Sequence, residues 1–97
     1  MSNHLFEIVF QNADFEFEGR DDVEEPLEEA LSDAELGEVT GGGSGPDTTN
    51  IDVEVTELEA GLALVRKVLL EIGAAKSTEI QYHIEGKAKP RKYRLQD

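Results

Sequence analysis

Residues 50–73 read NIDVEVTELEAGLALVRKVLLEIG, and two hydrophobic periods follow one another in this stretch. In residues 50–55, apolar side chains alternate with polar ones, as in a strand that buries one face. From residue 58 onward, apolar side chains recur at steps of three and four, which is the period of an amphipathic helix. Thr56 and Glu59 have the spacing of a capping box, and Gly73 has the position of a C-terminal glycine. The stretch therefore predicts a strand followed by a buried helix.

The N-terminal part of the chain contains the same two elements in the same order. Residues 5–10 alternate and carry apolar side chains on both faces, which predicts a central strand. A helix is expected over residues 22–36, where one apolar stripe is surrounded by acidic residues, and Gly37 is expected to close it. Residues 14–18 alternate strictly, so they either extend the first strand past a bulge or form a short return strand.

The remaining segments complete the pattern. Residues 38–40 predict a short strand, and residues 41–50, with four glycines and a proline, predict a loop. This loop and the strand after it indicate a hairpin with a long tip. Residues 80–84 alternate and predict a last strand. The basic residues 87–95 form either an edge strand, where lysine and proline block further pairing, or a disordered end.

The element order is strand, helix, strand, strand, helix, strand. This order is typical of the α+β class with a ferredoxin-like βαββαβ arrangement, in which two helices cover one face of an antiparallel sheet. The first and third strands are expected in the middle, because their inward faces are the most apolar. We expect one domain over residues 1–86, followed by the tail or edge strand of residues 87–97.

The charge of the chain is strongly negative and unevenly distributed. The 97 residues include 22 acidic and 9 basic ones, for a formal net charge of −13. Residues 1–60 carry 18 acidic residues and one basic residue, whereas residues 61–97 carry 8 basic and 4 acidic residues. Such a field repels phosphate, so neither nucleic acid nor an anionic membrane is expected as a partner. The asymmetry instead indicates an interaction surface of one sign.

Several kinds of chemistry have no support in the sequence. There is no cysteine, so neither a disulfide framework nor a thiolate nucleophile is available. The glycine-rich segment lacks the lysine and the following helix of a phosphate-binding loop. His4 and His83 fall on opposite faces of the predicted sheet, which disfavours a shared metal site. We therefore expect no enzyme, no cofactor and no metal, and, with no signal peptide or transmembrane segment in view, a cytoplasmic location.

One face of the predicted sheet is left without helices, and acidic side chains gather there. By the two-residue period this face carries four carboxylates, namely Glu7, Asp52, Glu54 and Glu79. Proteins that bind RNA through the same face use aromatic and basic side chains, which are missing at these positions. The face is interpreted either as an ordinary solvated sheet surface or as a docking surface for a basic protein partner.

The chain resembles the small, acidic, cysteine-free immunity proteins of bacterial polymorphic toxin systems. The resemblance lies in residues 37–43, 50–55 and 56–73, which form a glycine-rich hairpin, a strand and a helix that ends at a glycine. It implies a protein that neutralises one toxin, often a basic nuclease, and it assigns no functional residue. The leading prediction is a non-enzymatic protein-binding module. The alternative is a dimeric small-ligand-binding or regulatory sensor domain that uses the sheet face and the glycine-rich hairpin.

Overall fold

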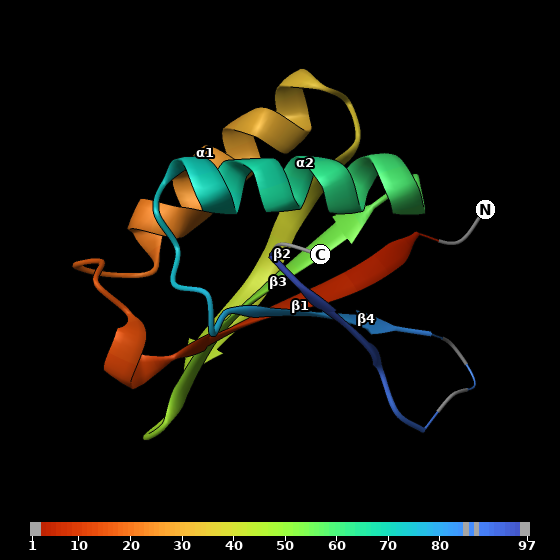
Figure 1. Ribbon diagram of the computed structural model, residues 1–97. Coiled ribbons are helices and arrows are strands. Elements are labelled where there is room, and N and C mark those ends of the chain that lie inside the picture. Colours follow the sequence, from red (N-terminus) through yellow and green to blue (C-terminus); the bar gives the residue numbers. More distant parts are fainter. Residues whose placement is uncertain (1–2, 85, 87, 96–97) are drawn as a thin grey trace.

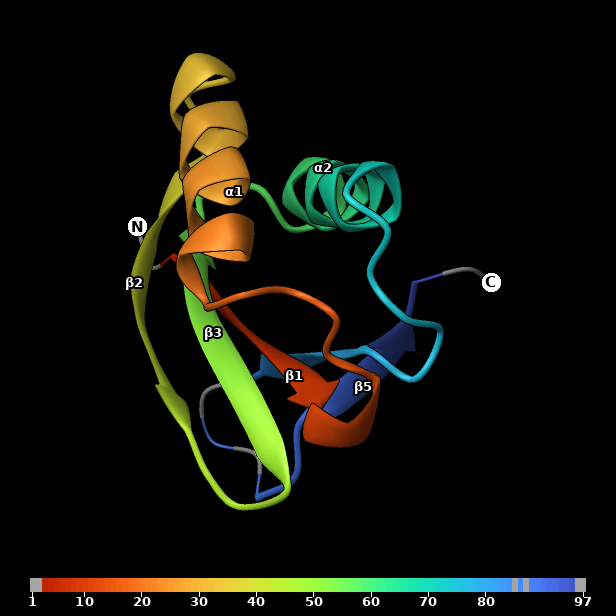
Figure 2. The same ribbon diagram turned by 90° about the vertical axis from the view of Figure 1, so that its left-hand side faces the viewer.

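The computed structural model describes residues 3–84, 86 and 88–95 of the chain. These residues form a five-stranded antiparallel sheet in the order β2-β3-β1-β4-β5, with both helices on one side of it (Figures 1 and 2). The predicted α+β class and βαββαβ order are confirmed, with a C-terminal edge strand added. The elements are β1 (His4–Gln11), a 3₁₀ turn (Asn12–Asp14), α1 (Asp21–Asp33), β2 (Gly37–Ser44), β3 (Thr48–Val55), α2 (Leu58–Glu71), β4 (Glu79–His83) and β5 (Arg91–Arg94).

The hydrophobic core lies between the helices and one face of the sheet. Alternate residues of β1 and β3 point into it, as the two-residue period predicts, and they meet the apolar stripes of α1 and α2. Leu69 on α2 is fully buried, whereas Leu62, which lies two turns earlier in the same helix, is only half-buried. The fully buried residues include Phe6, Ile8, Val23, Leu27, Leu31, Ile51, Val53, Val55, Val65, Leu69 and Ile80.

The start of α2 differs from the predicted capping box. The helix begins at Leu58 after Glu57, and no side chain caps its first turn. Thr56 lies outside the helix, and its hydroxyl donates to the carbonyl oxygen of Leu36 at 3.3 Å. The capping prediction was wrong because this carbonyl, 20 residues away in sequence, provides a tertiary partner. The predicted glycine end is confirmed, since Gly73 has a φ of 84°.

The end of α1 also differs from the prediction. Glu35, rather than Gly37, takes the left-handed conformation, with a φ of 55°. The amide of Leu36 donates to the carbonyl of Leu31 at 3.0 Å, which closes the helix in a Schellman motif. Gly37 already belongs to β2, and a Cβ there would overlap the backbone carbonyl of Glu54. A glycine is needed at this position because two strands approach closely, and not because a helix ends there.

The glycine-rich segment is a strand and not the predicted long loop. Most of it pairs with β3, and only residues 45–47 form the tip of the hairpin. Thr40 lies at a β-bulge between Val39 and Gly41. At the free side of β2, the amide of Val39 donates to the Glu28 carboxylate of α1 at 2.7 Å. The prediction was wrong because pairing with a neighbouring strand outweighs the low strand propensity of glycine.

Residues 12–20 follow neither of the two predicted paths. They form the short 3₁₀ turn and then an irregular connection to α1. The alternating Phe15 and Phe17 pack in a series of edge-to-face contacts, with ring centroids 5.3 Å apart for Phe10 and Phe15 and 5.1 Å apart for Phe15 and Phe17. The alternation therefore reflects a small aromatic cluster at the end of the core.

The basic C-terminal segment is ordered as an edge strand over Arg91–Arg94. Leu95, which follows it, is 4% exposed and belongs to the core. Arg66 of α2 holds this edge, because its Nε donates to the carbonyl of Arg94 at 2.9 Å and its guanidinium lies 5.5 Å from the ring centroid of Tyr93. Lys87, where the tail was predicted to begin, lies outside the described residues. Neither described helix has the length and apolar character that a membrane crossing requires.

Candidate functional site

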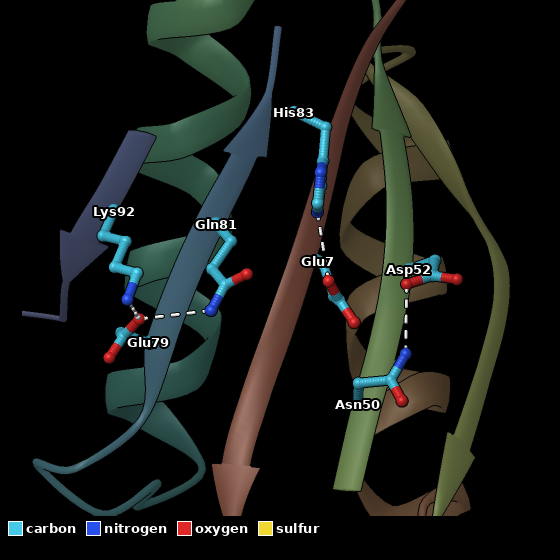
Figure 3. Close-up of polar contacts among 7 residues, drawn as sticks. All are labelled: Glu7, Asn50, Asp52, Glu79, Gln81, His83 and Lys92. Carbon is cyan, nitrogen blue, oxygen red and sulfur yellow. Dashed lines mark hydrogen bonds and ion pairs between the residues drawn. The ribbon is translucent and has the colours of Figure 1, made fainter. Parts of the chain in front are cut away.

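The open face of the sheet carries a group of carboxylates on β1, β2 and β3. We use the name acidic patch for Glu7, Glu38, Asp52 and Glu54. These side chains project from the face that the helices leave uncovered, because each is out of phase with the core residues of its strand. Figure 3 shows Glu7 and Asp52 on neighbouring strands of this face.

The strand register sets these carboxylates directly opposite one another. Glu7 of β1 pairs with Asp52 of β3, and Glu54 of β3 pairs with Glu38 of β2. Residues opposite each other in an antiparallel pair have Cβ atoms about 4.5–5.5 Å apart, and like charges at this separation destabilise the sheet. The acidic patch thus contains two like-charge pairs, each with one member on β3.

Only one half of the patch has polar partners among the described residues. His83 Nε2 lies 3.0 Å from Glu7 Oε1, and Asn50 Nδ2 donates to Asp52 Oδ1 at 3.2 Å (Figure 3). For Glu38 and Glu54, the described part of the chain offers no side-chain hydrogen bond and no ion pair. The negative charge of the patch is therefore left largely unbalanced at the β2–β3 edge.

The structure brings together three of the four predicted site residues and separates the fourth. Glu79 lies on the same face but across β1, opposite Val9, and its other neighbour is Arg94 of β5. Its Oε1 lies 3.8 Å from Lys92 Nζ and accepts from Gln81 Nε2 at 3.3 Å (Figure 3). Glu79 thus belongs to the basic edge of the sheet, where its charge is compensated.

Glu38 is the member of the patch that sequence reasoning missed. The alternation of the strand could have placed Glu38 on the open face. Glu38 begins the predicted strand over residues 38–40, and the side chain of the next residue, Val39, lies on the core side. Its pairing with Glu54 depends on the register between β2 and β3. This register was not predicted, because the glycine-rich segment was interpreted as a loop. The period of the strand gives the face of Glu38 but not its partner.

The two histidines contact different partners on different sides of the sheet. His4 Nδ1 lies 2.8 Å from the Tyr82 hydroxyl, and the two rings pack edge to face with centroids 5.6 Å apart. His83 contacts Glu7 on the open face. Within residues 3–84, 86 and 88–95, no group of three or more histidine, aspartate or glutamate side chains is arranged to hold a metal ion. The open face therefore offers carboxylates and a histidine for recognition by charge and hydrogen bonding.

Comparison with known proteins gives no relative from which a role can be transferred. No model of a known protein family matches the chain, and the searches of curated proteins and of solved structures return no match. The functional argument therefore depends on the geometry of the acidic patch.

Proposed function

We propose that the chain is a non-enzymatic protein-binding module that acts in the cytoplasm. Its acidic patch would dock a basic protein partner, as an immunity-type inhibitor does with a basic toxin or nuclease. The observation that supports this proposal is the strand register, which sets two like-charge pairs, Glu7 with Asp52 and Glu38 with Glu54, opposite one another on a face without helices. A bound cation between the members of each pair would convert repulsion into attraction.

The energetic argument follows from the environment of these carboxylates. Each like-charge pair costs the free protein a few tenths of a kcal/mol up to about 1 kcal/mol. Solubility alone does not need charges placed opposite one another, because α1 already carries exposed acidic residues such as Glu25 and Glu29. Lysine or arginine side chains of a partner would remove the repulsion on docking, so part of this cost is returned as binding free energy.

The same charges would accelerate the encounter. A surface dominated by one sign steers an oppositely charged partner and raises association rates by about 10- to 1,000-fold at low salt. Rates that depend on steering fall when salt screens the field. For an inhibitor of a toxic enzyme, fast capture is a useful property in itself.

The test is a pull-down with the immobilised chain at low and at high salt. We expect the wild-type chain to retain a basic protein at low salt and to release it at high salt. The double variant Asp52→Asn with Glu54→Gln should retain much less of it. The matched control is Glu25→Gln with Glu29→Gln, which removes the same charge from exposed positions of α1. Equal losses in both variants would show that net charge, and not the acidic patch, selects the partner.

A further inference from the structure

Two cavities meet at the opposite edge of the sheet, where β5 approaches the turn between α2 and β4. The first has a volume of about 420 Å³ and a mixed lining that includes Ser77, Glu79, Lys92 and Tyr93. The second has a volume of about 390 Å³, and its lining combines Leu70, Ala74 and Leu95 with two basic side chains. These basic side chains, Lys76 and Arg94, line both cavities, so the two cations stand where the cavities meet.

The charge at this boundary is positive in a chain that is otherwise strongly acidic. Among the described residues, no carboxylate lies within ion-pair distance of Lys76 or Arg94. The first cavity does contain Glu79, which Lys92 compensates at 3.8 Å. Asp14 lies behind its wall, where it accepts a hydrogen bond from Ser77 Oγ at 2.6 Å. An anion is therefore favoured where the two cavities meet and disfavoured near Glu79 in the first cavity.

The backbone that carries the two cations is held in place. The carbonyl oxygen of Arg94 accepts from Arg66 Nε at 2.9 Å, and Arg94 itself pairs with Glu79 in the strand register. Lys76 lies in a turn where the amide of Thr78 donates to the carbonyl of Ala75 at 3.0 Å. Thr78 is 2% exposed, which anchors this turn in the core. The backbone positions from which the two cations extend are thus set by the fold and not by a free tail.

The apolar side chains of the second cavity set a second requirement for the ligand. Among the described residues, Leu70 is the exposed large apolar side chain, with 41% of its surface accessible. The buried Leu95 and the half-buried Ala74 complete the apolar lining. A purely polar anion such as phosphate would leave this surface in water, whereas an apolar tail would cover it. Charge and apolar surface together point to an amphipathic anion.

We infer that this site binds a small apolar carboxylate of the medium-chain fatty acid class. The carboxylate lies between Lys76 and Arg94, where the guanidinium can donate two parallel hydrogen bonds. The alkyl chain lies against Leu70, Ala74 and Leu95. Cavities of this size are in the usual range for small-molecule sites, which are mostly apolar with a few polar groups that fix orientation. The site is separate from the acidic patch, and the inference does not depend on the proposed function.

The first experiment compares two probes of equal length and opposite charge. The ¹⁵N-labelled chain is titrated with octanoate and, separately, with octylammonium, while amide chemical shifts are followed. The net charge of −13 favours the cation, so tighter binding of octanoate would show that the local site overrides the field of the whole protein. We expect the shifted amides to be those of residues 70–78 and 92–95. Tighter binding of octylammonium, or shifts centred elsewhere, would overturn the inference.

The second experiment varies the chain length of the ligand and the side chains of the site. Each added methylene between butanoate and octanoate should tighten binding about two- to fourfold, because it buries apolar surface. Arg94→Gln should weaken octanoate binding by about tenfold, since it removes a charged hydrogen-bond donor, and Leu70→Ser should flatten the dependence on chain length. Lys89→Gln is the matched control, because it removes one exposed cation outside both cavities. Equal effects of Arg94→Gln and Lys89→Gln would show that only net charge matters and would refute the site.

Discussion

At Gly61, α2 packs so closely against Val55 of β3 that a side chain has no room, and replacement of this glycine by alanine tests how the helix docks. Gly61 is buried, and a Cβ built there would lie 2.7 Å from both Cβ and Cγ2 of Val55 and 2.8 Å from its Cγ1. Carbon atoms in good contact are about 3.5–4.0 Å apart. The methyl group of alanine would therefore overlap all three side-chain carbons of Val55, which is fully buried.

The expected magnitude follows from two opposing effects. Alanine is favoured over glycine in a helix by about 1 kcal/mol. Overpacking of a well-packed core costs about 1–3 kcal/mol, and Val55 has little freedom to yield because it is β-branched and fully buried. Because the methyl group would overlap three carbons, we expect an overpacking cost of about 2–3 kcal/mol, in the upper part of this range, so Gly61→Ala should lower the free energy of unfolding by about 1–2 kcal/mol. For a chain of this length, that corresponds to a fall of roughly 4–15 °C in melting temperature.

The assay is urea unfolding of Gly61→Ala, Val55→Ala and the double variant. Val55→Ala alone should destabilise the chain by leaving a cavity, and in the double variant it removes Cγ1 and Cγ2, two of the three carbons that the new methyl group overlaps. The double variant should therefore lose less stability than the sum of the two single variants, by about 1 kcal/mol or more. A rise in stability for Gly61→Ala, or strictly additive effects, would show that α2 does not approach β3 as closely as described.

Three further predictions concern stability and are tested by the same unfolding assay. Glu35→Gly should stabilise the chain by about 1 kcal/mol, because it relieves a left-handed conformation that is unfavourable for a residue with a Cβ; a loss of stability would contradict the described end of α1. Leu69→Ala should cost about 2–5 kcal/mol and Leu62→Ala clearly less, because only Leu69 is fully buried; the reverse order would mean that α2 is rotated. Asp52→Asn with Glu54→Gln should raise the free energy of unfolding by a few tenths of a kcal/mol up to about 1 kcal/mol, because it removes one charge from each of two like-charge pairs. A fall of similar size would show that the carboxylates stabilise the sheet.

The parts of the fold that were predictable are those where local pattern and tertiary burial agree. The alternation in residues 51–55 and the helical period up to Ile72 both reflect burial against the same core, so the sequence carries the signal directly. The end of α2 at Gly73 was predictable for the same reason, since a left-handed residue favours glycine locally.

The errors occur where a distant part of the chain supplies the partner. The hydroxyl of Thr56 bonds a carbonyl of the α1–β2 connection, and the glycines of β2 are held by β3. In the candidate site, the two-residue period places Glu79 correctly on the open face but does not show which residues lie beside it there. Its charge is compensated by Lys92 of β5, a strand that the sequence left open as an alternative. The two-residue period of a strand shows on which face of the sheet a side chain lies. The register between paired strands decides which side chains lie beside it.

The most direct test of the proposed function is the association rate with the basic partner recovered in the pull-down. Stopped-flow measurements over a series of salt concentrations would compare the wild-type chain with two double variants, Asp52→Asn with Glu54→Gln in the acidic patch and Glu25→Gln with Glu29→Gln on α1. Both variants remove two negative charges, so they change the net charge equally. If the acidic patch docks the partner, the first variant should slow association and flatten its salt dependence markedly more than the second. Equal rates for the two variants, or a larger effect of the α1 variant, would contradict the assignment of the open sheet face as the binding surface.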